Sequence, residues 1–411
     1  MRRRVADLIG TVIGANLPIR VVAYDGSKTG PDDAEVVLRI ESPRALARLA
    51  SAPGTLGLAR AYVTGEIEVE GDIYAALDAL ADVTLNSIKP SEQLRVAAQM
   101  LPMWLRYRPA PPDLEARPRG RRHSKSRDSQ AIAHHYDVSN TFYEYVLGPS
   151  MTYTCARYPT AGSTLEEAQA AKHELIAQKL ALAPGMRLLD VGCGWGGMVM
   201  HAAAEHGVHA LGVTLSRSQA EWAQAEIERR GLDRLAEVRH LDYRDVAESG
   251  FDAVSSIGLT EHIGREQLSS YFRFLCGRLR PEGRLLNHCI THPRTLRQRR
   301  VDPFIGRYVF PDGQLEPVGQ LITEMNNAGF EIRHEENLRE HYARTLAAWG
   351  ANLEENWEAA VAEVGVARAR VWRLYMAASR LGFERDNIQL HQMLGVKLGA
   401  DGRSGFPLCG W

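Results

Sequence analysis

One short stretch of the chain combines an acid with a cluster of glycines, a combination that suits the binding of a charged cofactor. Asp190 lies in the apolar run Leu188–Val191, which is typical of a buried strand. Glycines follow at positions 192, 194, 196 and 197, and the apolar-rich run after them predicts a helix. Glycine lets the backbone approach a ligand closely, and a helix N-terminus presents free N–H groups. The stretch therefore predicts a cofactor cradle; a glycine turn without a ligand is the alternative.

The spacing of these glycines fits two classes of cofactor. Gly192, Gly194 and Gly197 satisfy the G-x-G-x-x-G pattern of dinucleotide sites, which is a weak signal by itself. The carboxylate of Asp190 would repel a pyrophosphate, whereas it would attract the sulfonium and ammonium groups of S-adenosylmethionine. A dinucleotide site also needs an acid about 20 residues further on, at the end of the second strand. No carboxylate follows that strand before Glu221, so the residues favour S-adenosylmethionine and a methyltransferase.

The elements around this stretch alternate between strand and helix. Strands are predicted at 186–191, 208–213, 236–241, 251–257 and 284–290, and helices at 198–206, 217–230 and 265–279. Such alternation predicts an α/β fold with a parallel sheet and helices on both faces. Ligands of such sheets bind at the carboxyl ends of the strands. The polar residues gather at those ends: Asp190, 214–219, 242–244, 260–262 and 288–290.

The composition of the chain limits the remaining possibilities. Its 411 residues allow two or three domains, and 49 basic against 50 acidic residues give no net charge that would attract nucleic acid. The five cysteines are odd in number and lack metal-ligand spacing, so we expect no metal site and a reduced, cytoplasmic protein. No segment reaches the length of a membrane span. Action on lipid would therefore have to take place from the membrane surface.

The chain divides by its composition into three parts. Residues 1–105 predict a small α+β accessory domain for docking or dimerisation, with a strand at 36–40 and a helix at 91–105. Residues 106–130 predict a basic, proline-rich linker, either solvated and mobile or attracted to anionic lipid headgroups. Residues 131–411 predict the methyltransferase domain, whose largely helical end, 344–397, we expect to cap the substrate side.

Two segments are rich in aromatic residues. In 134–158 the aromatic residues alternate with polar ones, which favours a lid over cofactor and substrate against simple packing of a helix on the sheet. The segment 291–320 combines arginines with Phe304, Tyr308 and Phe310. Basic and aromatic residues together suit a membrane-interface element. A cap over the substrate pocket and ordinary surface remain equal alternatives.

Five ordered motifs resemble the cyclopropane fatty acid synthase family, which includes the mycolic acid cyclopropane synthases and the actinobacterial enzymes that make methyl- or methylene-branched phospholipid chains. The motifs are His135-Tyr-Asp-x-Ser, Tyr153-Thr-Cys155, Leu189-Asp-Val-Gly-Cys-Gly-Trp-Gly, Gly212-Val-Thr-Leu-Ser-x-x-Gln219 and Glu261-His-Ile-Gly264. The similarity runs from about residue 55 to 400, and the N-terminal domain points to the long, phospholipid-acting branch. The resemblance implies a class I, Rossmann-like methyltransferase with a mainly parallel seven-stranded sheet.

The resemblance also implies roles for individual residues. S-adenosylmethionine would be held by Tyr153, Thr154, Asp190, Gly192, Gly194, Leu215 and Gln219, with Asp242 and Tyr243 beside the adenine. The family holds a bicarbonate ion in its active site, and the positions that surround it match Cys155, Glu261, His288, Ile290 (through its backbone) and Tyr342. Thr260 departs from the family pattern, because many relatives carry Phe there. This changes the pocket wall beside Glu261 and tilts the expected product toward branching.

The chemistry of alkene methylation calls for such a site. An alkene is a weak nucleophile, so it must be pressed against the sulfonium methyl group in a dry pocket. Attack leaves a carbocation in the acyl chain, which aromatic faces can stabilise; the candidates are Tyr136, Phe142, Tyr308 and Tyr342. A bicarbonate oriented by Glu261, His288 and Tyr342 would then take a proton. If the new methyl group loses it directly, a cyclopropane closes; a prior hydride shift gives a methylene branch, which a reductase could convert to a methyl branch.

We therefore expect a peripheral enzyme at the inner face of the membrane that methylates the double bond of unsaturated phospholipid acyl chains of the oleoyl type. Its partners would be the unsaturated phospholipid, with a reductase and a second copy of the chain as further candidates, and no nucleic acid. One alternative is a small-molecule carbon methyltransferase on the same fold. Another is a lipid-binding or scaffold protein without catalysis, against which the joint presence of Glu261, His288 and Tyr342 argues.

Overall fold

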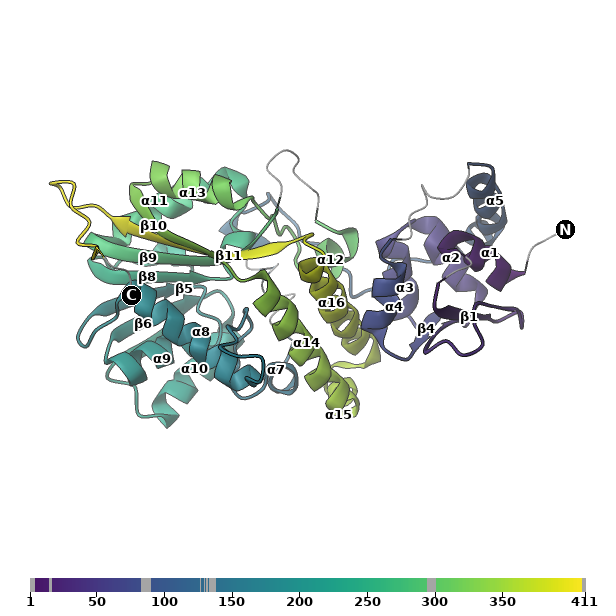
Figure 1. Ribbon diagram of the computed structural model, residues 1–411, viewed down its shortest axis with the longest axis horizontal. Helices are drawn as coiled ribbons and strands as arrows, with labels where there is room; N and C mark the ends of the chain where they lie inside the picture. Colours follow the sequence, from purple (N-terminus) through teal and green to yellow (C-terminus); the bar gives the residue numbers. More distant parts are fainter. Residues whose placement is uncertain are drawn as a thin grey trace. The chain divides into compact units, whose positions relative to one another are not determined.

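The structure, a computed structural model, describes residues 4–14, 17–82, 90–125, 127–128, 130, 132, 138–293 and 301–408. The chain forms two compact units, whose elements are labelled in Figure 1. Unit 1 consists of Met1–Ala116, Asp302–Val309 and Trp357–Leu381, and unit 2 consists of Arg117–Val301, Phe310–Asn356 and Gly382–Trp411. The parts predicted from the sequence were each continuous, whereas both units combine three separate stretches of the chain.

A seven-stranded sheet forms the centre of unit 2, in the order β10-β11-β9-β8-β5-β6-β7 (Figure 1). Its strands are β5 Arg187–Val191, β6 His209–Thr214, β7 Ala236–His240, β8 Phe251–Ile257, β9 Leu279–Thr291, β10 Phe330–Asn337 and β11 Gln389–Lys397. The strands from β9 to β7 are parallel, and β11 pairs antiparallel with both β9 and β10. The chain order reverses beside β5, and such a switch point is where α/β sheets bind ligands.

Helices cover both faces of this sheet (Figure 1). Helices α8 Leu165–Leu180, α9 Gly197–His206 and α10 Arg217–Arg229 lie on one face, and α11 Leu268–Arg278 and α13 Val318–Asn327 lie on the other. Neighbouring residues of β5 serve the two faces, because Leu188 packs in the core with Ile176 and Met198, whereas Leu189 packs with Phe272. A strand buried on both faces needs an unbroken apolar run, which explains why the sequence signal at β5 is so strong.

The remaining elements of unit 2 are shorter or lie outside these layers. They are α7 Asn140–Leu147, α14 Arg339–Glu355 and the 3-10 helices η2 Tyr243–Asp245, η3 Thr260–His262 and η4 Arg265–Gln267. The predicted α/β fold with a mainly parallel sheet is confirmed. Two predicted elements differ from the structure. The helix expected at 265–279 begins as η4 and becomes α-helical at Leu268, and the largely helical end expected at 344–397 includes the interior strand β11.

Unit 1 has a sheet and a core of its own. The sheet has the order β2-β1-β3-β4, with β1 Ile19–Ala23, β2 Lys28–Thr29, β3 Val36–Ile40 and β4 Ile67–Glu70. Its helices are α1 Val5–Ile13, α2 Pro43–Ser51, α3 Thr55–Val63, α4 Ile73–Leu80, α5 Pro90–Tyr107, α12 Pro303–Tyr308, α15 Trp357–Val364 and most of α16 Val366–Glu384, whose end from Gly382 belongs to unit 2. The predicted strand at 36–40 and helix at 91–105 therefore both form, within an α+β arrangement.

A hydrogen bond and an ion pair join the later stretches of unit 1 to its first 116 residues. Arg60 pairs with Glu115 at 2.5 Å, and the hydroxyl of Tyr308 donates to the same carboxylate at 3.2 Å. Arg370 on α16 pairs with Glu68 on β4. The side chain of Glu115 is 1% exposed, so losing Arg60 would leave its carboxylate without the compensating charge.

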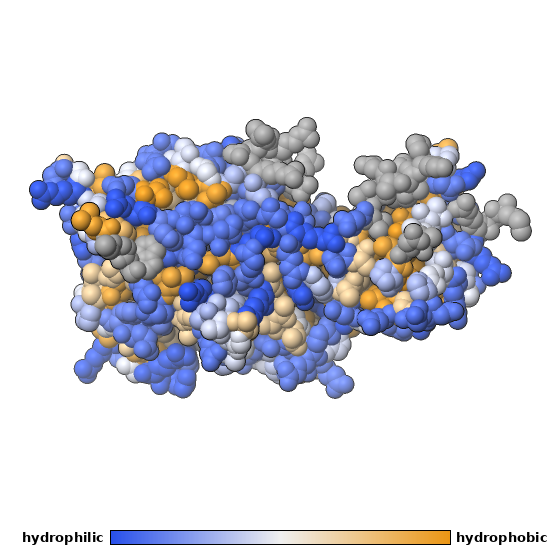
Figure 2. Space-filling view, in the orientation of Figure 1, coloured by the Kyte–Doolittle hydropathy of each residue, from blue (hydrophilic) through white to orange (hydrophobic). Residues whose placement is uncertain are grey.

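Basic side chains of the predicted linker form ion pairs on the surface of unit 2. Arg122 and Arg127 pair with Asp312 at 2.9 and 2.5 Å, and Lys125 pairs with Asp245 at 2.6 Å, so these charges are engaged within unit 2. The face of unit 2 in Figure 2 is mostly hydrophilic, with apolar side chains gathered beside α11 and α13. Across the described ranges, no helix is long and apolar enough to cross a membrane. The arginine cluster at 294–300 lies outside the described residues.

Candidate active site

A cavity lies at the carboxyl ends of β5, β6 and β8 in unit 2. The predicted cofactor residues that line it are Tyr153, Thr154, Asp190, Gly192, Gly194, Leu215, Gln219 and Tyr243. Gly192 and Gly194 have φ angles of 72° and 56°, which lie in the left-handed region that glycine adopts without strain. A Cβ atom on Gly192 would also lie 3.1 Å from Leu259. The turn needs glycine there both for its conformation and for space.

The carboxyl group of Asp190 is buried at the end of β5, beside the glycine turn. Its side chain is 2% exposed, and the hydroxyl of Ser255 donates to Oδ1 at 2.6 Å. Burial raises the pKa of Asp190 to about 7 because the ionised form is poorly solvated. A cation bound in the cavity would stabilise that ionised form. The site therefore fits S-adenosylmethionine, whose sulfonium and ammonium groups are positively charged.

The structure adds a residue to this cavity that the sequence analysis missed, Lys172 on α8. Its side chain is buried, and Nζ donates to Thr154 Oγ1 at 2.9 Å and lies 3.1 Å from Nε2 of His173. Burial lowers the pKa of Lys172 to about 7, against the attraction of nearby Asp190. The sequence offers only a weak signal, because Lys172 lies four residues before Ile176 but α8 has no pronounced apolar stripe.

Asp242 is the predicted cofactor residue that does not line the cavity. Its carboxylate accepts the backbone N–H of Arg244 at 2.9 Å and the guanidinium of the same residue at 2.6 Å, and so begins η2. Arg244 also contacts Asp128 at 3.1 Å. The resemblance placed Asp242 and Tyr243 together beside the adenine. Tyr243 lines the cavity, and so does Arg244, the residue that holds Asp242 beside it.

A second group of polar side chains lies where β8 and β9 end. Glu261 follows β8 in η3, between Leu259 and His262, which both line the cofactor cavity. Its Oε1 accepts the backbone N–H of Ile290 at 2.7 Å, whereas the shielded Oε2 has no hydrogen-bond partner among the described residues. Burial raises the pKa of Glu261 to about 7. A protonated carboxyl group that can donate a hydrogen bond is therefore available near neutral pH.

His288 on β9 contributes another shielded atom, Nε2, which has no partner within the described part of the chain. Its Nδ1 lies 3.1 Å from the side-chain nitrogen of Gln392 on β11. Gln392 accepts a bond from Lys179 at 2.8 Å through Oε1, which turns its NH₂ group toward His288. Nδ1 is then the acceptor, and Nε2 carries the hydrogen. Burial lowers the pKa of His288 well below its usual value, so the ring is neutral and Nε2–H is a donor.

Cys155 and Tyr342 are the other residues that the resemblance assigned to the bicarbonate site. Cys155 is fully buried, and its thiol contacts the carbonyl oxygen of Ala156 at 3.1 Å. Burial raises the pKa of this thiol, so it remains protonated. The ring of Tyr342 on α14 lies 4.5 Å from that of Phe383 and 6.1 Å from that of Trp349. Ile290, whose backbone was expected beside the bicarbonate, donates its backbone N–H to Glu261.

The aromatic candidates occupy different environments. Phe142 is buried in α7, edge to face with Tyr143. Tyr308 belongs to unit 1, where it donates to Glu115. Tyr136 lies outside the described residues. Thr260, which marks the departure from the family pattern, is buried and donates to Asn287 at 2.6 Å.

The described part of the aromatic segment 134–158 both packs on the fold and lines the cavity. The ring of Tyr143 lies 4.6 Å from that of Trp195 in the glycine turn, and the indole N–H of Trp195 donates to Asn140 at 2.9 Å. Tyr153 lines the cavity, with its ring 5.3 Å from that of Trp349. Packing and cavity lining, which the sequence set against each other, therefore occur in the same segment.

Comparison with solved structures defines the class of protein. The mycolic acid cyclopropane synthase CmaA1, solved in complex with SAH and CTAB, has a TM-score of 0.62 and 32% sequence identity, over 65% of this chain and 97% of its own. SAH is S-adenosylhomocysteine, the form of the cofactor that remains after methyl transfer. With the glycine turn and the buried Asp190, this neighbour identifies a class I methyltransferase that uses S-adenosylmethionine.

Sequence comparison then defines the family. The sequence model of the mycolic acid cyclopropane synthetase family matches residues 123–393. A Mycobacterium tuberculosis protein named "Probable fatty acid methyltransferase" is 52% identical over 96% of this chain and 94% of its own. The cyclopropane-fatty-acyl-phospholipid synthase of Escherichia coli is 36% identical over 63% of this chain and 66% of its own. The chain belongs to the mycolic acid cyclopropane synthetase family. These relatives indicate methylation of fatty acyl chains that gives a cyclopropane or a branch.

Proposed function

We propose that this enzyme transfers a methyl(ene) carbon from S-adenosylmethionine to the double bond of an unsaturated phospholipid acyl chain, of the oleoyl type, at the inner face of the membrane. The observation that carries the proposal is the pair of shielded, unpartnered atoms Glu261 Oε2 and His288 Nε2, counted within the described ranges. Buried polar atoms normally have hydrogen-bond partners, so the pair supports a polar ligand that binds there during turnover. The backbone N–H of Gly258, which lines the cofactor cavity, donates to the carbonyl of His288 at 2.8 Å.

Bicarbonate has the chemistry to bind both atoms. A protonated Glu261 and the Nε2–H of His288 are both donors near neutral pH, and the oxygens of bicarbonate accept such bonds. The backbone of Ile290 holds Glu261 through its other oxygen, so the free oxygen keeps a fixed position. Gln392 fixes the tautomer of His288 in the same way. When bound there, bicarbonate would supply a base for the proton that the acyl chain loses.

The other side chains of the site act on charge and on water. S-adenosylmethionine supplies, when bound, a methyl group on a cationic sulfur. Asp190 provides the opposite charge. Lys172 repels the cation only while it is protonated, and it loses its proton near pH 7. The rings of Tyr153, Trp349 and Tyr342 follow one another at 5.3 and 6.1 Å. Their faces can stabilise positive charge on an acyl chain, and burial keeps water away from it.

An exposed apolar stripe on α5 supports attachment to a membrane. Its members lie on one side of the helix, and the exposed fractions are 72% for Leu94, 51% for Leu101, 38% for Trp104 and 49% for Leu105. The opposite side packs on the core of unit 1 through Met100 and Met103. A helix with one apolar side free and arginine at its end, here Arg106, suits the lipid interface.

Mass spectrometry of phospholipids from a bacterial host supplied with oleate tests the proposal. We expect a gain of one CH₂ on unsaturated chains when the protein is present, and fragmentation separates a ring from a branch. With purified enzyme, removal of bicarbonate should abolish turnover and its return should restore it. No CH₂ gain with cofactor binding intact would favour a small-molecule carbon methyltransferase, and absence of turnover on any acceptor would favour a lipid-binding protein without catalysis.

A further inference from the structure

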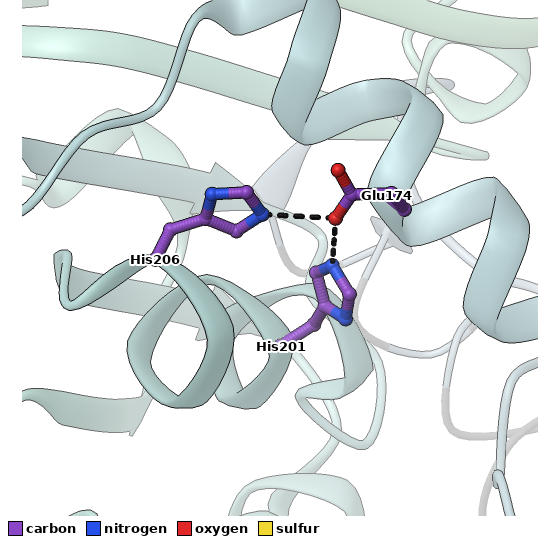
Figure 3. Close-up of side chains that lie close together, drawn as sticks. All are labelled: Glu174, His201 and His206. Carbon is purple, nitrogen blue, oxygen red and sulfur yellow. Dashed lines mark hydrogen bonds and ion pairs between the residues drawn. The ribbon is translucent and has the colours of Figure 1, made fainter.

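Two helices beside the cofactor site bring three metal-ligating side chains together (Figure 3). Glu174 is on α8, and His201 and His206 are on α9. The Oε2 atom of Glu174 lies 3.3 Å from Nε2 of His201 and 3.0 Å from Nε2 of His206. The three ligand atoms all lie within 4.8 Å of one another. None of these residues belongs to the five family motifs or to the lining of the cofactor cavity.

Two of the three separations suit the ligands of a small divalent ion. Zn²⁺ binds imidazole nitrogen and carboxylate oxygen at about 2.0–2.2 Å, so two ligands at tetrahedral positions lie about 3.3–3.6 Å apart. The observed separations of 3.3 and 3.0 Å are close to that distance between ligands. Two imidazoles and one carboxylate are also a ligand set that zinc sites use with one position left open. Imidazole ligands favour zinc and its transition-metal neighbours over magnesium and calcium.

The ligands are accessible and partly oriented in advance. The side chains of His201, His206 and Glu174 are 15%, 20% and 40% exposed, so an ion can reach them from solvent. Gln178 donates to the other oxygen of Glu174 at 2.9 Å, which holds Oε2 toward the two imidazoles. Such outer contacts are typical of residues around metal ligands. The carboxylate of Glu205 adds negative charge that acts on His201.

We propose that Glu174, His201 and His206 bind one Zn²⁺-type ion, with solvent in the fourth position, and that the ion fastens α8 to α9. In the metal-free chain the two imidazoles share one carboxylate oxygen as hydrogen-bond acceptor. Moving each ring hydrogen from Nε2 to Nδ1 frees both nitrogens to bind the ion while the rings stay neutral. The proposal is independent of the substrate and of the bicarbonate site.

The site connects to the cofactor cavity through His173. The ring of His173 lies 5.7 Å from that of His201, which lies 5.7 Å from that of His206. His173 lines the cavity, and a Cβ atom on Gly197, the first residue of α9, would lie 3.0 Å from its ring. An ion that fixes α9 against α8 therefore also fixes the helix whose N-terminus faces the cofactor.

Metal binding to the full chain, without an affinity tag and stripped of metal by a chelator, tests the proposal. Calorimetric titration with Zn²⁺ alone should give one ion per chain, and Zn²⁺ should raise the melting temperature. Co²⁺ should give the intense visible bands of a tetrahedral nitrogen and oxygen site. It should give no near-ultraviolet thiolate band, which would instead indicate the partly exposed Cys193 or Cys276.

Three variants locate the site. His206→Gln and Glu174→Gln should each weaken Zn²⁺ binding by more than the roughly 10- to 100-fold that loss of an outer partner costs. His209→Gln changes an exposed histidine at the start of β6 and should bind Zn²⁺ as the unmodified chain does. The melting temperature of each variant in chelator separates loss of a ligand from loss of the fold. If one of these variants has a much lower melting temperature, His201→Gln is used in its place. No stoichiometric binding, unchanged binding in the variants, or a thiolate band would overturn the proposal.

Discussion

Replacing Asp190 with asparagine removes the charge of the carboxyl group at the end of β5 while it keeps the size of the side chain. The amide oxygen can still accept the hydrogen bond that Ser255 donates to Asp190 at 2.6 Å in the unmodified chain. The glycine turn should therefore keep its shape. What the chain loses is the negative charge that faces the cationic cofactor. We therefore expect weaker binding of S-adenosylmethionine with little change in folding.

The magnitude follows from the pKa of Asp190. Burial moves this pKa from 3.8 to about 7, and a shift of about three units corresponds to about 4 kcal/mol of penalty on the ionised form. A bound cation favours the ionised form, and each unit by which it lowers the pKa of Asp190 corresponds to about a tenfold gain in affinity. We expect the cation to lower this pKa by one to two units, so Asp190→Asn should weaken binding about 10- to 100-fold.

The pH dependence gives a second measurement of the same interaction. In the free chain Asp190 is protonated below about pH 7, so cofactor affinity should rise with pH up to about 7 and then level off. Lys172 acts in the same direction, because loss of its proton near pH 7 removes a like charge. Asp190→Asn should remove one part of this slope and Lys172→Met the other. Calorimetric titration with S-adenosylmethionine across this pH range measures both.

The result that would refute this reasoning is specific. If Asp190→Asn binds S-adenosylmethionine as tightly as the unmodified chain at pH 8, and with the same pH dependence, then the carboxylate does not face the cation. The electrostatic argument that separated this cofactor from a dinucleotide would then fail, although the fold would be unaffected. Ser255→Ala is a useful companion, because it should raise the pKa of Asp190 further and move the pH profile upward.

Further predictions concern catalysis, the membrane and the glycine turn. Glu261→Gln should keep cofactor binding but lower turnover on oleoyl-phospholipid vesicles by about 10²- to 10⁴-fold, whereas Glu266→Gln, an exposed neighbour, should be near normal; comparable turnover in both would remove Glu261 from the mechanism. Leu101→Ser and Trp104→Ser should each weaken binding to anionic vesicles by about 1 kcal/mol, as measured by sedimentation. Unchanged binding would mean that the α5 stripe does not contact the membrane. Gly192→Ala should destabilise the cofactor-free chain by about 1–3 kcal/mol in urea, because its φ is positive and a leucine crowds the site; a smaller loss would mean that the turn relaxes.

The sequence predicted the parts of the site whose signals are local. The buried strand, the glycines and the helix after them are adjacent in the chain, so the turn around Asp190 could be predicted from its own residues. Lys172 could not, because its burial depends on which face of α8 meets the sheet. The bond from Ile290 to Glu261 likewise depends on β8 and β9 lying side by side.

Two features that the sequence did not predict have the same origin. The strand β11 is buried along almost its whole length, so it lacks the alternation of apolar and polar residues that marks a half-exposed strand. The engagement of Asp242 by Arg244 depends on a turn that local propensity does not specify. In each case a contact between distant or irregular segments decided the outcome, and the sequence pattern carried no periodic signal for it.

The composition of unit 1 has a consequence for how the chain folds during synthesis. Asp302, which begins the second stretch of unit 1, lies 186 residues beyond Ala116, which ends the first. At about 5–20 residues per second, a ribosome needs on the order of 10 to 40 s to make that intervening chain. Until then the hydrogen bond from Tyr308 to Glu115 cannot form, and the ion pair between Arg370 and Glu68 forms later still. The N-terminal stretch therefore lacks these partners while the strands of the catalytic sheet emerge, and we expect it to be less stable when it is expressed alone.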